Sequence, residues 1–177
     1  MRKEQQLTGV ERHFAADDVI VTKTDLKGRI TYVNRTFLDI AGLTLDQALG
    51  APHSIIRHPA MPRCVFKLLW DTIEGGREIF AFVVNRAVNG DHYWVLAHVT
   101  PSFGPDGKII GYHSNRRVAD PRLVRDVVTP LYAELCAVEN AQADRKQGML
   151  AAHAALVAKL QAAGVSYDRF FFSLLDK

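Results

Sequence analysis

The sequence is poor in cysteine, with only Cys64 and Cys136 among its 177 residues. The two stand far apart, without the close spacing of a metal-binding pair, so we expect no metal site. Each lies in an apolar stretch typical of buried thiols. This cysteine usage fits a reducing cytoplasm.

Long apolar runs and a dominant charge are missing as well. No stretch reaches membrane-spanning length, and the N-terminus MRKEQQLTGVERHF is too polar for a signal peptide. The net charge is only +3, and the basic residues are scattered among acids, which gives no stripe for nucleic acid. We expect a cytoplasmic protein with no membrane span and no nucleic-acid partner.

Catalytic motifs are also lacking. We find no nucleophile–base pair, no Gly-rich phosphate loop and no cluster of metal ligands. His92 and His98 lie six residues apart on one predicted strand, about 20 Å from each other, which is too far to share a metal. The pattern argues against an enzyme.

What is present suits one globular domain with an addition, because 48% of the residues are hydrophobic and 23% charged. Residues 18–24 and 29–34 alternate around the turn DLKG and predict a hairpin. Three longer strands follow, EIFAFVVNRAV, DHYWVLAHVTPSF and KIIGYHSNRRV, separated by the turn signals Asn89-Gly90 and GPDG.

Helical patterns fill the segment between these two groups of strands. Residues 36–41 are one, Thr44 is a plausible N-cap for the next, and a third runs from Arg63 to Gly75-Gly76 with one apolar face. The order predicts an α+β fold with a five-stranded antiparallel sheet and short helices on one face.

Beyond Pro121 the composition becomes helical. An apolar stripe contains Leu131, Leu135 and Val138, and it predicts a homodimer or a docked partner. A second helical pattern spans 149–163 and ends at Gly164, and the aromatic tail YDRFFFSLL is expected to dock back onto the sheet. We divide the chain into an N-terminal cap (1–17), a sensor domain (18–120) and a C-terminal helical extension (121–177).

The connector SIIRHPAMP places Arg57 and His58 in a short segment stiffened by two prolines. Because the segment is stiff, its side chains are expected to have fixed directions rather than to be mobile. The alternative is that both are solvated surface charges.

The segments TDLKGRITYVNRTF, GAPHSIIRHPAMP, LLWDTI, VVNRAVNGDHYWV and GYHSNRRV, in this order, resemble the PAS sensor domain over about residues 10–130. RHPxMP followed by NRxxNGDHYWV resembles its aerotaxis-receptor branch in particular. Members of that branch, and the similar PAS domain of a nitrogen-fixation redox regulator, hold FAD non-covalently and report its redox state. The resemblance implies a redox or oxygen sensor that signals through its C-terminal helices to a chemoreceptor-type or kinase-type partner.

By this resemblance, five residues bind the cofactor. Arg57 and His58 would contact the flavin or its ribityl-phosphate tail, as would His53 unless it caps a turn. Asn85 matches the asparagine that binds the isoalloxazine edge, although a strand-end side chain exposed to water is the other interpretation. Trp70 matches a tryptophan near the flavin, and core packing is its alternative role.

The chain departs from the family pattern at Ala60, where Asp is frequent, and at Ile79, where Trp is frequent. The pocket is therefore expected to be tuned differently. The aerotaxis receptor also carries membrane and methyl-accepting segments that this sequence lacks, so we do not expect a complete chemoreceptor.

Three other assignments compete with a sensor that holds FAD non-covalently. A photosensory LOV domain needs a cysteine in the connector, which SIIRHP lacks, and Cys64 lies beyond it. A haem sensor needs an axial imidazole, for which His58 or His113 remains available. A cofactor-free interaction module would need a filled pocket, and Ala81 and Ala97 are too small to fill it.

Overall fold

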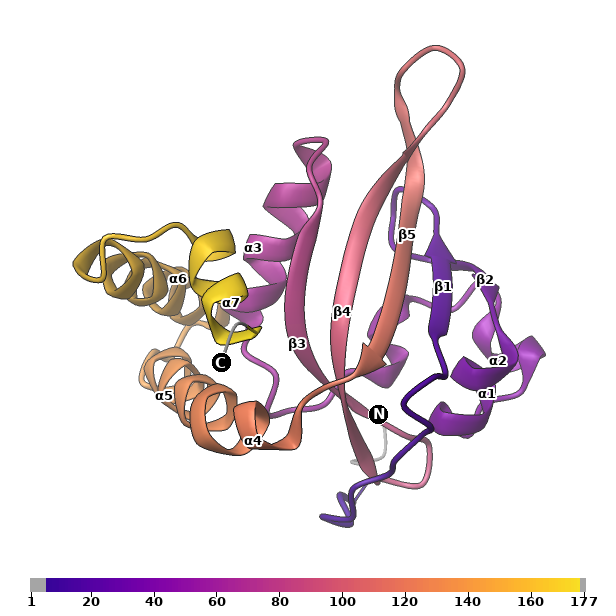
Figure 1. The fold of residues 1–177 in the computed structure, drawn as a ribbon, viewed down its shortest axis with the longest axis horizontal. Coiled ribbons are helices and arrows are strands. Elements are labelled where there is room, and N and C mark those ends of the chain that lie inside the picture. The colour runs from indigo at the N-terminus through magenta and orange to yellow at the C-terminus, as the bar shows by residue number, and fades with distance from the viewer. Residues whose placement is uncertain (1–5, 176–177) are drawn as a thin grey trace.

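The computed structural model describes residues 6–175, which contain one five-stranded antiparallel sheet in the order β2-β1-β5-β4-β3. The strands are β1 (Ile20–Thr24), β2 (Ile30–Val33), β3 (Ile79–Arg86), β4 (His92–Phe103) and β5 (Ile109–Val118). The predicted fold class and strand order along the chain are confirmed. In Figure 1 the β4–β5 hairpin projects beyond the rest of the molecule.

Turn chemistry closes the hairpins as expected. In the β1–β2 turn, Asp25 accepts hydrogen bonds from the backbone of Lys27 and Arg29, and Gly28 has a φ of 73°. In the β3–β4 turn, Gly90 has a φ of 96°. Such positive φ values suit glycine because it has no Cβ.

Three helices and one 3₁₀ turn connect β2 to β3: α1 (Arg35–Ala41), α2 (Leu45–Ala48), η1 (His53–Ile56) and α3 (Arg63–Glu74). Thr44 caps α2 in a reciprocal pair of hydrogen bonds with Gln47, as its sequence predicts. On α3, Leu69 and Ile73 are buried, whereas Trp70 is only partly buried.

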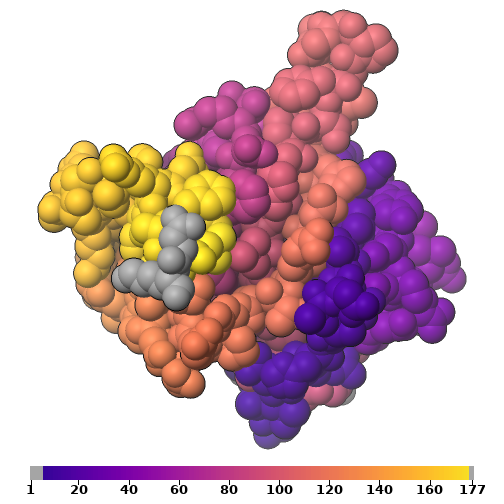
Figure 2. All heavy atoms as spheres, in the orientation of Figure 1, coloured from indigo at the N-terminus to yellow at the C-terminus, as the bar shows by residue number. Residues whose placement is uncertain are grey.

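The C-terminal helices are α4 (Pro121–Leu123), the π-helical segment η2 (Val124–Val128), α5 (Thr129–Asn140), α6 (Arg145–Ala162) and α7 (Tyr167–Leu175). Tyr132 donates a hydrogen bond to the carbonyl of Phe82 over 2.6 Å, and Tyr167 donates to that of Phe80 over 2.8 Å. Figures 1 and 2 show these helices gathered against the β3 side of the sheet. Helix α7 therefore packs on the sheet face opposite α3, since Phe171 contacts Phe80 and Phe82, which alternate with the cavity-lining Val83.

The aromatic tail docks within the chain, as predicted. Phe171 is only 2% exposed, with its ring centroid 5.2 Å from that of Phe82 and 5.9 Å from that of Phe80. The apolar stripe packs inward as well, because Leu135 is fully buried in the same core and Leu131 and Val138 are partly buried against it. This internal burial removes the stripe as an argument for self-association, and the homodimer stays a prediction.

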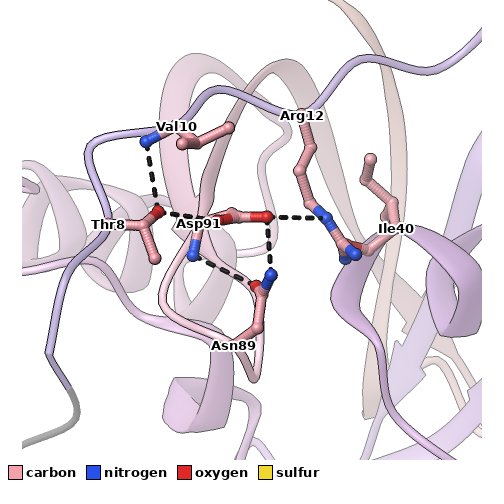
Figure 3. A network of polar contacts seen from close by, with 6 residues as sticks. All are labelled: Thr8, Val10, Arg12, Ile40, Asn89 and Asp91. Atoms are coloured by element: carbon pink, nitrogen blue, oxygen red, sulfur yellow. Dashed lines mark hydrogen bonds and ion pairs between the residues drawn. The ribbon is translucent and has the colours of Figure 1, made fainter.

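The N-terminal segment is held to the β3–β4 turn by a polar network centred on Asp91 (Figure 3). Thr8 donates a 2.6 Å hydrogen bond to this carboxylate, Arg12 pairs with it at 3.2 Å, and Asn89 donates to it over 2.7 Å. Arg12 also donates to the carbonyl of Ile40 over 2.6 Å. The segment thus links the turn to α1. The proposed domain boundaries at 17/18 and 120/121 stay predictions.

Within the described residues, no single helix is long and apolar enough to cross a membrane, and only the pair α6 and α7, bent by 70° at their junction, passes by length and composition.

Candidate ligand cavity

A cavity of about 470 Å³ lies between the sheet and α3, and such a volume is typical of small-molecule sites. Its walls are mainly apolar. The apolar side chains of the two facing walls are Val83, Ala97 and Val99 from the sheet and Phe66, Leu69, Trp70 and Ile73 from α3.

Asn85 and Arg57 meet at one side of this cavity, where their backbones form an isolated antiparallel bridge. Asn85 is 3% exposed, and its Nδ2 has no hydrogen-bond partner among the described residues. The Arg57 guanidinium lies 4.4 Å from the ring centroid of Phe66, and its buried Nη2 is likewise unpartnered. Unsatisfied buried donors are costly, so both atoms suit a ligand that accepts hydrogen bonds.

Trp70 lines the cavity from α3 and meets Tyr112 of β5 edge to face, with ring centroids 5.4 Å apart. Gly28 lies against the six-membered ring of the indole, since a Cβ placed there would be 3.2 Å from its Cη2 and Cζ2 atoms. The indole is thus positioned by a strand and a turn, and it forms part of the apolar cavity wall.

A third polar group, the guanidinium of Arg116, also lines the cavity. Arg116 of β5 donates to Thr22 Oγ1 over 3.0 Å and to His53 Nε2 over 2.6 Å. Burial and the Arg116 charge lower the pKa of His53 well below its ordinary value, so its imidazole is neutral. Ser114, on the same strand face, has a buried hydroxyl without a partner among the described residues.

A wider polar groove of about 1,350 Å³ adjoins the cavity. The two share Arg57 and Arg63 as lining residues. The charged or titratable side chains along the groove are Arg57, His58, Arg63, Arg86, Arg145, Glu139 and Cys136. With four guanidinium groups and one carboxylate, the groove suits an anion.

His58 lies in this groove rather than in the cavity. Its Nδ1 accepts a hydrogen bond from the backbone of Ala60 over 3.1 Å, and its ring centroid is 5.7 Å from that of His92. Burial, with the charges of His92 and Arg86, lowers the pKa of His58.

The structure therefore brings most of the predicted site residues together. His53, Arg57, Trp70 and Asn85 line the cavity, whereas His58 lines only the adjoining groove. The sequence analysis missed three polar residues of β5, which are Tyr112, Ser114 and Arg116. The alternation of GYHSNRRV, which places these three on one strand face, was the signal that could have found them.

The cavity offers few residues for a LOV-type cysteine adduct or for a metal site. Cys64 is fully buried in the core, where burial, with Glu139 acting in the same direction, raises the pKa of its thiol to about 12. Cys136 lines the groove. His113 borders the cavity, but strand alternation places its side chain on the opposite sheet face from Tyr112 and Ser114, where its Nε2 lies 3.1 Å from Asn115 Oδ1. Within residues 6–175, no three metal-ligating side chains gather as a metal site.

Comparison with known proteins places this architecture. A family model described as the PAS fold matches residues 15–114. The chain belongs to the PAS family. Residues 15–114 contain the whole sheet apart from the end of β5, and they supply all of the cavity-lining residues except Arg116 and Met149.

Two curated relatives extend this assignment. The PAS domain and its flanks are 39% identical over 136 residues to the aerotaxis receptor of Escherichia coli, which covers 76% of this chain but 26% of the receptor. The nitrogen fixation regulatory protein of Klebsiella pneumoniae is 27% identical over 56% of this chain and 20% of its own length. The chain thus spans about a quarter or less of these relatives, and the first supports the predicted aerotaxis-receptor branch.

Solved structures agree on the fold. The light state of the blue-light photoreceptor Aureochrome1 LOV aligns with a TM-score of 0.56 and 25% identity, over 63% of this chain and 89% of that one. A PAS domain of Colwellia psychrerythraea aligns with a TM-score of 0.53 at 19% identity, over 57% of this chain and 86% of that one.

Proposed function

We propose that this PAS protein is a cytoplasmic redox or oxygen sensor that binds FAD non-covalently and relays the redox state of the flavin to its C-terminal helices. The observation that carries the proposal is the pairing of an apolar cavity with a basic groove. A flavin dinucleotide has the same two parts, a flat ring system and a diphosphate tail.

The cavity supports the isoalloxazine end. The Nδ2 of Asn85, the Oγ of Ser114 and the Nη1 of Arg116 are buried polar atoms of cavity-lining residues, without partners among the described residues. A tricyclic ring with oxygen and nitrogen atoms along one edge would satisfy them, and Trp70 would pack against its apolar part. When bound, the flavin supplies the redox chemistry.

The groove supports the diphosphate end. Arg57 lines both spaces, and burial lowers the pKa of Arg57, with the charges of Arg63 and Arg145 acting in the same direction and Glu139 against it. Such a surplus of positive charge favours a phosphate ligand by charge-assisted hydrogen bonds. Because Arg145 belongs to α6, the C-terminal helices would take part in holding the cofactor.

Two contacts support the relay. Met149 of α6 lines the cavity, so a change in the ligand reaches this helix directly. Glu139 of α5 accepts hydrogen bonds from Arg63 and from the Cys64 backbone over 2.9 and 2.8 Å, which ties α5 to the first turn of α3. Signals would pass from these helices to a chemoreceptor-type or kinase-type partner.

The names of the relatives favour sensing over catalysis, since they are a receptor for aerotaxis and a regulator of nitrogen fixation. Although the Aureochrome1 LOV neighbour is a blue-light photoreceptor, neither thiol of this chain lies among the cavity-lining residues. Redox chemistry without a covalent adduct is therefore the reading that we propose.

Reconstitution with flavins tests the proposal. The absorption spectrum of freshly purified protein is expected to show flavin bands, and apo-protein is expected to take up FAD more tightly than FMN or riboflavin. Asn85→Ala and Arg57→Ala are each expected to weaken FAD binding by about 1–3 kcal/mol, because each removes a buried hydrogen-bonding group. Arg35→Ala, which removes a solvent-exposed arginine of α1, is the matched control.

Two results would overturn it. One is the failure of wild-type protein to take up FAD, and the other is uptake by Asn85→Ala and Arg57→Ala that equals wild type. Haem is the alternative cofactor, with His58 or His113 as the axial ligand that the sequence offers, and a Soret band would establish it. A featureless spectrum would favour the cofactor-free interaction module.

A further inference from the structure

Arg116 occupies the central strand of the sheet, with Ile20 of β1 and Ala97 of β4 as its backbone neighbours. Its side chain lies on the cavity face, and the residue is only 5% exposed. Arginine is rarely buried to this extent without a partner of opposite charge. The position therefore requires a reason beyond packing.

The contacts of Arg116 satisfy its hydrogen bonds only in part and leave its charge uncompensated. One nitrogen, Nη2, donates to Thr22 Oγ1 at 3.0 Å and to His53 Nε2 at 2.6 Å, and both acceptors are neutral. The other terminal nitrogen, Nη1, is buried and has no partner among the described residues. Thr22 and His53 thus orient the guanidinium without neutralising it.

No carboxylate among the described residues pairs with Arg116, in contrast to Arg63, which pairs with Glu139 at 2.9 Å. Burial lowers the pKa of Arg116 to about 10, so the side chain remains a cation at neutral pH. A buried, unpaired cation destabilises the folded protein. A ligand that brings negative charge into the cavity would relieve this cost.

We propose that Arg116 selects the redox form of the bound flavin, by binding the polar edge of the ring and favouring its reduced, anionic form. This inference rests on the proposed flavin binding. Two electrons from an external reductant and one proton at the flavin N5 convert the neutral oxidised ring into the hydroquinone anion. Its negative charge is delocalised over that polar edge, where a fixed cation stabilises the reduced form more than the oxidised form.

The test is a reductive titration of the flavin-loaded protein against a reference dye. Arg116→Gln keeps a hydrogen-bonding side chain but removes the charge. It is expected to reduce the preference for reduced over oxidised flavin by 10- to 100-fold, which lowers the two-electron midpoint potential by about 30–60 mV.

Arg116→Lys keeps the charge and is expected to shift the preference by less than tenfold. Arg117→Gln makes the same charge change on the exposed strand face and is expected to leave the potential unchanged.

A second neutral variant separates ligand selection from structural support. Arg116→Met removes an uncompensated buried charge, so the flavin-free protein is expected to be at least as thermostable as wild type. If both neutral variants fail to fold, Arg116 is a structural residue and the proposal is overturned. An unchanged potential in an Arg116→Gln protein that binds oxidised flavin overturns it as well. Wild-type protein that takes up no flavin refutes the proposed function and this inference together.

Discussion

Gly28 lies in the β1–β2 turn, and its lack of a side chain leaves room for Trp70. Its φ is 73°, and a Cβ there would lie 3.2 Å from two atoms of the indole. Trp70 in turn packs edge to face on Tyr112. The positive φ and the close approach of the indole both favour glycine here, and this turn residue therefore affects the position of Trp70 in the cavity wall.

Gly28→Ala is expected to destabilise the protein by about 1–2 kcal/mol through its left-handed backbone alone. It is also expected to displace Trp70 and to lower flavin occupancy severalfold. Gly107→Ala is the matched control, because its φ is 74° and a Cβ would meet nothing within 4 Å. Both variants are compared by thermal denaturation and by the flavin-to-protein absorbance ratio. Equal flavin occupancy in the two variants would show that the contact between position 28 and Trp70 does not affect flavin binding.

At the scale of elements, the junction between α5 and α3 is the clearest link between the PAS domain and its C-terminal helices. Glu139 is 4% exposed and accepts hydrogen bonds from Arg63 and the backbone of Cys64. A carboxylate at the first turn of a helix also complements the helix dipole. Burial alone would raise the pKa of Glu139, but the hydrogen bonds from Arg63 and Cys64 lower it below its ordinary value of 4.5.

Glu139→Gln is expected to lower the free energy of unfolding by about 1–3 kcal/mol at pH 7, because the amide cannot accept both hydrogen bonds. The native pKa is depressed, so the stabilisation is present above pH 4.5 and is lost as the pH falls through the native value. The free energy of unfolding, measured by urea titration at pH 7 and below pH 4.5, is therefore expected to differ less between wild type and variant at the acidic pH.

The exposed pair Arg35–Asp39 on α1 provides the control for this comparison. Asp39→Asn is expected to cost less than about 1 kcal/mol, since exposed ion pairs contribute little. A Glu139→Gln variant no less stable than Asp39→Asn would show that the junction does not hold α5 to α3.

At the scale of the whole molecule, two sets of helices flank one sheet. Helix α3 carries Trp70 on the cavity face, while α7 covers the opposite face through Phe171. Helix α6 also reaches the cavity through Met149. The C-terminal helices therefore contact both the sheet and the ligand space, and a change in the flavin would affect them through α6.

Reduction of the bound flavin is expected to change amide hydrogen exchange in α5 and α6, with a coupling of about 1–3 kcal/mol, and to leave α1 unchanged. Met149→Ala is expected to diminish the response. Leu150→Ala, at an exposed position of the same helix, is expected to preserve it. Identical exchange in the oxidised and reduced protein would refute the relay. Light scattering on the same samples measures whether the predicted homodimer forms.

The sequence by itself determined the local structure. Alternating residues, the turn signals around Gly28 and Gly90 and the Thr44 cap predicted the elements, because these depend on residues close in the chain. The motif residues Arg57 and Asn85 were found through the resemblance to the PAS family, and the structure brings them together at one backbone bridge.

Only the tertiary structure decided which distant side chains meet. The contacts of Arg116 with Thr22 and His53 join residues 94 and 63 positions apart, and those of Glu139 depend on how α5 crosses the start of α3. The sequence shows that the chain contains an arginine at position 116, but strand register and helix packing determine whether a carboxylate lies next to its buried charge. Arg116 finds none among the described residues, because the neighbours that register gives it are neutral, and its unpaired charge therefore faces the cavity.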